Sequence, residues 1–209
     1  MFDMLQNGGV FMYVILSLSV LAGALFLERA GFLYFRLKLN MDKAFKKVMF
    51  HLDKANYRAA IEECTRIEKH PLGRILKAGL LQSDKKDKDI ERALEEKILN
   101  EIPRVKAKIN YLTLFANIAT LLGLLGTIMG LITSFQSVSS ASDAAKQEML
   151  ASGISMAMLT TAAGLIVAIP CLVGYYILSN RGDFLIEKFE QKALGLANAL
   201  STLKRSGSA

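Results

Sequence analysis

The chain has 209 residues, of which 52% are hydrophobic and 22% are charged, with a mean hydropathy of +0.32. A sequence this apolar that also carries this much charge is not typical of a soluble enzyme, so its charges must be segregated. The formal net charge of +7 suits a basic face beside anionic lipid. No recognition module with suitably placed aromatics indicates nucleic-acid binding.

Three stretches contain no Asp, Glu, Lys or Arg: residues 4–27, 109–142 and 149–180, which are 24, 34 and 32 residues long. A helix needs about 20 residues to cross a hydrocarbon core of about 30 Å, so each stretch can span a bilayer. Buried soluble helices are the alternative, but the charged remainder could not cover three of them. The first stretch could be a signal peptide; because it lacks a basic start and is too long, we expect it to be retained.

The basic residues predict the orientation of the chain. No Lys or Arg precedes Glu28, 20 lie in residues 29–108, Lys146 alone lies between the second and third stretches, and five follow Asn180. Since Lys and Arg near membrane ends stay on the cytoplasmic side, residues 29–108 and the carboxyl-terminal tail are predicted to be cytoplasmic. The predicted fold is an all-α membrane protein with the amino terminus outside and the carboxyl terminus inside. Its predicted parts are a first transmembrane helix with a periplasmic amino terminus (1–35), a cytoplasmic helical domain (36–108), a second transmembrane helix (109–136), a periplasmic loop (137–148), a third transmembrane helix (149–180), and a cytoplasmic helix and tail (181–209).

Helical hairpins are predicted in the cytoplasmic domain, because its apolar residues recur at helical spacing. One stripe contains Ala44, Val48, Leu52 and Ala55, and a second contains Ala59, Ala60, Cys64 and Ile67. Pro71 and Gly73 predict a turn at residues 70–73, followed by a short helix at 74–81. Ser83 and Asp84 are predicted caps of a long helix that Pro103 bends, and residues 183–203 are predicted to form a tail helix.

Catalytic and metal-binding patterns are missing from the sequence. It has no Gly-rich phosphate loop, no Ser/His/Asp set and no carboxylate pair in a catalytic context, so we expect neither enzymatic activity nor a cofactor. Cys64 and Cys171 fall in the cytoplasmic domain and the third span, where neither suits a structural disulfide. Together with His51 and His70 they show no metal-ligand spacing.

Polar and small residues follow helical spacings in the second and third spans. Thr113, Thr120, Thr127 and Ser134 are each seven residues apart, so they stay nearly on one helix face, drifting only about 20° per step. The third span carries small residues that allow helix backbones to approach closely: Gly153, Ala157, Thr161, Gly164, Ala168 and Cys171. Each hydroxyl could instead bond the carbonyl one turn back and merely pack. The row as a whole indicates a close contact or a polar path within an assembly, and Pro170 predicts a kink.

Four stretches of this sequence carry a resemblance to a known family. They are Asn7-Gly-Gly-Val-Phe-Met-Tyr13 leading to Leu27-Glu-Arg29, then Pro71-Leu-Gly-Arg74 with Ala78, then Leu121-Leu-Gly-Leu-Leu-Gly-Thr-Ile-Met-Gly130, and finally residues 153–164 running on to Ala168-Ile-Pro170. In this order they cover nearly the whole chain. The chain resembles the MotA/TolQ/ExbB proton-channel family and is most similar to its ExbB branch.

The resemblance implies a function and a set of site residues. Such chains form a homopentamer in the bacterial inner membrane, around a dimer of a single-span ExbD/TolR-like subunit that carries a membrane Asp. Proton flow through a pore lined by the second and third spans drives a motor that energises a TonB- or TolA-like partner. By this resemblance, Thr127 and Thr161 are pore threonines. We expect Thr120, Ser134 and Thr160 to join the ion pathway as well. Helix packing is assigned to Gly123, Gly126, Gly130, Gly153, Gly164 and Pro170.

Two departures from the family pattern concern the ion pathway. ExbB and TolQ members usually carry Glu in the third span where this chain has Met156, and usually Pro where it has Thr120. The spans therefore lack an acidic group, and the nearest, Glu28, is expected to pair with Arg29. MotA-like members manage without that Glu, so the protonatable group is expected on the partner. The alternative function is a non-conducting scaffold or a transporter permease subunit.

Overall fold

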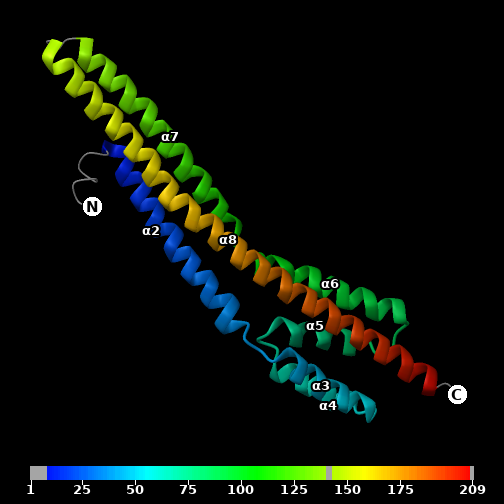
Figure 1. Ribbon diagram of the computed structural model, residues 1–209. Helices are drawn as coiled ribbons and strands as arrows, with labels where there is room; N and C mark the ends of the chain where they lie inside the picture. Colours follow the sequence, from blue (N-terminus) through cyan, green and yellow to red (C-terminus); the bar gives the residue numbers. More distant parts are fainter. Residues whose placement is uncertain (1–8, 140–142, 208–209) are drawn as a thin grey trace. The chain divides into compact units, whose positions relative to one another are not determined.

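The computed structural model describes residues 9–139 and 143–207, which form helices joined by short connections and contain no strand. Asn7 of the first quoted motif and residues 140–142 of the predicted outer loop lie outside the described residues. Figure 1 shows the elements in chain order: α2 (Gly9–Gly31), the π-helix η1 (Phe32–Arg36), α3 (Met41–Asp53), α4 (Tyr57–Arg66), α5 (Pro71–Leu80), α6 (Asp87–Lys106), α7 (Asn110–Ser139) and α8 (Asp143–Gly207).

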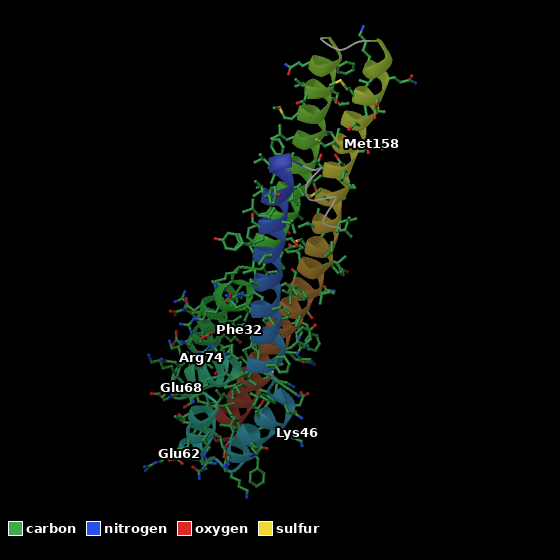
Figure 2. All side chains as sticks on the ribbon, turned by 90° about the vertical axis from the view of Figure 1, so that its left-hand side faces the viewer. Phe32, Lys46, Glu62, Glu68, Arg74 and Met158 are labelled. Carbon is green, nitrogen blue, oxygen red and sulfur yellow. The ribbon has the colours of Figure 1, made fainter. Side chains whose placement is uncertain are left out.

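Three of the described helical stretches, those that contain α2, α7 and α8, are long and apolar enough to cross a membrane. The predicted all-helical fold and its three helices capable of spanning a membrane are confirmed. Large apolar side chains remain exposed on these helices, for example Val20 at 70% and Met158 at 68%. Met158 is labelled in Figure 2. Such a surface is costly in water, so it is built to face lipid or another chain.

Residues 1–29 and 108–178 form one compact unit, the membrane unit, in which α2, α7 and the first part of α8 lie side by side (Figure 1). Small buried residues from all three helices make its core: Ala22, Ala116, Ala119, Ala168 and Cys171. Leu18, Phe115 and Val167 pack against this core. Small side chains bring the helix backbones close, which is how helices associate where lipid removes the hydrophobic driving force.

Residues 30–107 and 179–209 form a second compact unit, the helical domain. Helix α5 packs against α4 and α6, and α3 packs against α4. The buried core contains large aliphatic and aromatic side chains, as in a water-soluble domain: Val48, Leu52, Leu72, Ile75, Leu76, Leu80, Leu185, Phe189 and Leu196. Lys192 on α8 pairs with Asp42 at 2.5 Å, and Lys106 on α6 pairs with Asp183 of α8 at 2.7 Å.

The turn predicted at residues 70–73 is wrong, because α5 begins at Pro71. Pro71 lies in the first helical turn, where the N–H that it lacks would have no partner. The His70 side chain caps this end, since its Nδ1 accepts a hydrogen bond of 3.2 Å from the Leu72 N–H. Gly73 lies inside the helix. Glycine suits this position because an added Cβ would be only 2.4 Å from the Ile67 carbonyl oxygen.

Other predicted helix ends also differ from the structure. Helix α3 ends at Asp53, so Ala55 falls in the next loop with a φ of 54°. The predicted caps Ser83 and Asp84 are wrong, because α6 begins at Asp87 after an N-cap residue, Lys86, that makes no side-chain hydrogen bond. The predicted tail helix is not separate, since α8 continues unbroken from the apolar stretch to Gly207, and helical structure runs across Pro170.

Candidate functional site

Helices α7 and α8 approach most closely along a row of glycines. A Cβ added to Gly123 would lie 3.1 Å from the Thr161 Cα, and one added to Gly126 would lie 2.6 Å from the Thr160 hydroxyl. On the facing helix, a Cβ added to Gly164 would lie 2.6 Å from the Ala119 carbonyl oxygen. The structure brings together five of the six residues that the sequence assigned to helix packing: Gly123, Gly126, Gly130, Gly153 and Gly164.

The close approach lets hydroxyls of α8 reach the backbone of α7. The Thr161 Oγ1 donates to the Gly123 carbonyl oxygen at 3.1 Å. Thr160 is 2% exposed, and its Oγ1 lies 2.8 Å from the carbonyl oxygen of Ala157 in its own helix and 3.5 Å from that of Gly123. Gly123 therefore has two roles. It has no side chain to block the contact, and its carbonyl oxygen accepts a hydrogen bond from the facing helix.

Three of the four hydroxyls in the row of α7 bond locally. Thr120 donates to the Ala116 carbonyl at 3.0 Å, Thr127 to that of Leu124 at 2.5 Å, and Ser134 to that of Gly130 at 2.7 Å. For these three this is the local packing alternative that the sequence left open, whereas the hydroxyl of Thr113 is buried with no hydrogen-bond partner among the described residues. The oxygen of each group keeps acceptor capacity, so the row can still accept a hydrogen bond from water or a carboxylic acid.

A groove of about 570 Å³ lies in the membrane unit between α7, α8 and the first turn of α2. Polar groups lining it include Thr133, Ser134, Ser152 and Thr160, and Met156 lies among them. Val10 and Phe11 of α2 supply part of its apolar wall. Three predicted pathway or family positions, Ser134, Thr160 and Met156, thus share one groove, whereas Thr127 and Thr161 are not among its lining residues.

Glu148 also lines this groove, and the sequence reasoning missed it. Glu148 lies one residue before the uncharged stretch and so was counted as part of the outer loop. In the structure α8 already begins at Asp143, so Glu148, Ser152, Met156 and Thr160 follow one helix face at four-residue steps. An acidic residue four positions before a polar helical row was the signal available in the sequence.

Pro170, assigned to helix packing, lines a different and mostly apolar pocket. This pocket of about 380 Å³ lies between α2 and α8, with Phe26 and Gly174 among its lining residues. At the end of α2, Glu28 accepts hydrogen bonds of 2.9 and 3.2 Å from Lys108, which precedes α7, and lies 3.5 Å from Arg29. The expected pairing with Arg29 is therefore present, with Lys108 as an additional and closer partner.

The Pro71-Leu-Gly-Arg74 stretch has an identifiable physical role in the helical domain. Arg74 binds Glu101 of α6 through two parallel hydrogen bonds of 2.7 Å, and Glu101 is 1% exposed. Its remaining Nη1 donates to the carbonyl oxygens of Glu68 and Lys69, at 2.8 and 3.2 Å. The hydrogen bonds from Arg74 to Glu101 raise the pKa of the guanidinium, against the opposing effect of its partial burial. One side chain thus ties α5 to α6 and to the connection between α4 and α5.

His70 is held neutral beside this ion pair. It is 6% exposed and stacks edge to face on Phe189 of α8, with ring centroids 5.8 Å apart. Burial lowers the pKa of His70 from 6.5 to about 4, although the Leu37 carbonyl acts in the opposite direction. Among the described residues no three His, Cys, Asp or Glu side chains cluster as a metal site.

These features define a class of protein: a helical membrane protein whose spanning helices pack through glycines beside a groove that carries hydroxyl groups. Over residues 67–191, more than half of its length, the chain matches the MotA/TolQ/ExbB proton channel family. The chain belongs to that family, which confirms the resemblance seen in the sequence.

Two relatives from Synechocystis sp. carry ExbB-like names. The chain is 36% identical over 170 residues to biopolymer transport protein ExbB-like 3, covering 79% of each chain. It is 32% identical over 185 residues to biopolymer transport protein ExbB-like 1, covering 84% of this chain and 69% of the relative. Among solved structures, a chain of the C. jejuni MotAB structure shares the fold with a TM-score of 0.66, at 17% identity, over 93% of this chain and 80% of that one.

Proposed function

We propose that this chain is the pore-forming subunit of a proton-driven motor in the bacterial inner membrane. The observation that carries the proposal is the groove of about 570 Å³ in the membrane unit, whose mostly apolar wall carries hydroxyls of α7 and α8 and the carboxyl group of Glu148. Polar groups at membrane depth are costly unless they face a partner or an ion path. A groove of this kind suits proton movement better than a scaffold role, which needs only packed helices.

The proposed topology follows the distribution of basic residues. We place the amino terminus and residues 137–148 in the periplasm, and residues 36–108 and 181–209 in the cytoplasm, because Lys and Arg gather in the latter two segments. Residues 1–35, 109–136 and 149–180 then contain the membrane-spanning helices. In this orientation the mouth of the groove at Glu148 opens toward the periplasm.

The proposed assembly is a pentamer around a dimer of a single-span, ExbD/TolR-like partner with a membrane Asp. Support comes from the family and from the uncharged stretches of this chain, which carry no acidic group between residues 149 and 180. A carboxylic acid that is exposed alternately to each side must then come from the partner. The client is proposed to be a TonB- or TolA-like transducer, since relatives are named biopolymer transport proteins.

Thr127 and Thr161 are the proposed pore threonines, with Thr120, Ser134 and Thr160 along the same pathway. Replacing Thr127 and Thr161 with Val keeps their shape and removes the oxygens that could accept a hydrogen bond from the partner's carboxylic acid. We expect the double variant to assemble normally with its partner and to lose at least 90% of proton-dependent transport in cells, a loss of order tenfold or about 1.4 kcal/mol.

The control for this experiment is Thr202→Val. Thr202 also bonds the carbonyl one turn back, at 2.9 Å, but lies in the helical domain. It should transport as the unmodified protein does. Full transport by the Thr127→Val, Thr161→Val protein would show that these hydroxyls do not take part in the pathway.

A further inference from the structure

A basic pocket lies in the helical domain directly after the first membrane-spanning helix. Its volume is about 470 Å³, and residues of η1, of the α4–α5 connection and of α6 line it. Arg36, Lys69 and Arg104 supply cationic groups, while Phe32 and Leu37 supply an apolar side. Phe32 and Arg74, both labelled in Figure 2, line this pocket.

The pocket has a surplus of positive charge that its own residues do not neutralise. Glu101 is the acidic residue of the lining, and both of its oxygens are bound by Arg74. Arg104 approaches Glu101 only at 3.5 Å, and its side chain is 66% exposed. Arg36 and Lys69 are exposed and have no ion pair among the described residues. Three cations therefore surround a space whose one carboxylate is already occupied.

The position of the pocket along the chain indicates its ligand. Arg36 follows Leu27, the end of the uncharged stretch, by nine residues, so it lies near the headgroup region of a membrane that α2 crosses. The intervening segment carries exposed aromatics, Tyr34 at 44% and Phe35 at 79%. Arg181 of α8 lies over the Tyr34 ring at 5.3 Å. Aromatic rings beside basic side chains are typical of the membrane–water interface.

From this combination we propose that the pocket formed by Arg36, Lys69 and Arg104 binds a phosphate group, supplied by an anionic phospholipid. The guanidinium groups of Arg36 and Arg104 each offer paired donors that match phosphate oxygens, and the Lys69 ammonium adds a point charge. Phe32 and Leu37 contact the glycerol and the start of an acyl chain. The Arg74–Glu101 pair holds α5 against α6 and so fixes the floor of the pocket. This site is independent of ion conduction.

The test is lipid binding by the purified full-length protein, measured by native mass spectrometry. Phosphatidylglycerol and phosphatidylcholine with identical acyl chains are titrated in parallel. The unmodified protein should retain phosphatidylglycerol preferentially, and the triple variant Arg36→Gln, Lys69→Gln, Arg104→Gln should bind it about 100-fold more weakly, since each basic group near an anionic surface adds to the attraction. The double variant Arg36→Gln, Lys69→Gln leaves the contact between Arg104 and Glu101 intact and should weaken binding about 30-fold.

A matched control removes the same charge from exposed positions of the helical domain that do not line the pocket, through Lys46→Gln, Lys47→Gln and Lys88→Gln. This control should bind as the unmodified protein does. Displacement of the lipid by millimolar inorganic phosphate would assign the same site to free phosphate, whereas retention assigns it to lipid. Equal binding of both lipids, or an equal loss of phosphatidylglycerol binding in the control, would overturn the proposal.

Discussion

At the scale of single residues, hydroxyls in this protein do more than fill space. The Thr161 bond to Gly123 joins two helices, whereas Thr120, Thr127 and Ser134 bond within their own helix. The sequence predicted one ion pathway for all four residues and could not separate the two cases. Whether a hydroxyl crosses to a neighbour depends on a missing side chain in that neighbour, which is a property of the pair of helices.

Replacing Glu101 should lower the stability of the whole helical domain. Glu101→Gln leaves the Arg74 guanidinium partly buried without a counter-charge, which costs about 3 kcal/mol. The melting temperature of the purified protein should fall by roughly 6–10 °C. Arg104→Gln is the control, because its contact with Glu101 is long and solvent-exposed, and it should change the melting temperature little. Equal effects of the two variants would contradict this ranking.

His70 should make the stability of the helical domain depend on pH. Its folded pKa of about 4 lies below the unfolded value of 6.5, so the unfolded state binds a proton first as the pH falls. The stabilisation is complete above pH 6.5 and is lost progressively between pH 6.5 and 4. At pH 5 the free energy of unfolding has fallen by about 2 kcal/mol relative to its value at high pH.

The measurement for His70 is thermal unfolding at pH 7 and pH 5, compared with His70→Asn. Asn can still cap α5 with its side-chain oxygen but does not titrate. The variant should lose less stability than the unmodified protein between these two pH values. Parallel curves would show that His70 does not carry the dependence.

At the scale of helices, the sequence predicts the apolar stretches well and the connections poorly. Long uncharged stretches and a small-residue spacing are strong signals, and α2, α7 and α8 follow from them. The start of α5 was missed because Pro71 and Gly73 are typical of turns, and only the contact of Gly73 with the Ile67 carbonyl explains the glycine. The position of Glu148 in the groove was missed because α8 begins before its apolar stretch does.

The glycine contact between α7 and α8 predicts a pair of opposite mutational effects. In Gly164→Ala the new Cβ meets the Ala119 carbonyl oxygen at 2.6 Å and the Gly123 Cα at 3.2 Å, and backbone atoms cannot move aside cheaply. Overpacking of this kind costs about 1–3 kcal/mol, so the melting temperature should fall by several degrees. Gly23→Ala is the control, because nothing lies within 4 Å of its Cβ and Ala favours a helix. A fall in both variants would argue against the specific contact.

At the scale of the whole molecule, the membrane unit is incomplete by itself. Its core is small, large apolar side chains such as Val20 and Met158 remain exposed, and its groove leads from Glu148 to Thr160 without a second acidic residue. The helical domain, by contrast, has a dense core and a buried ion pair. The proposed function therefore places the carboxylic acid of the ion-carrying step on a partner chain.

Proton flux into sealed vesicles tests this central claim most directly. The purified chain is reconstituted alone and with a single-span partner, and an internal pH dye reports entry under an imposed proton gradient. A membrane potential supplies about 2.3 kcal/mol per charge per 100 mV, enough to drive a carboxyl group that is exposed alternately to each side, but this chain carries no Asp or Glu between residues 149 and 180. We expect no flux above that of empty vesicles for the chain alone, clear flux with the partner, and loss of that flux when the partner's membrane Asp is changed to Asn. Robust flux through the chain alone would contradict the account.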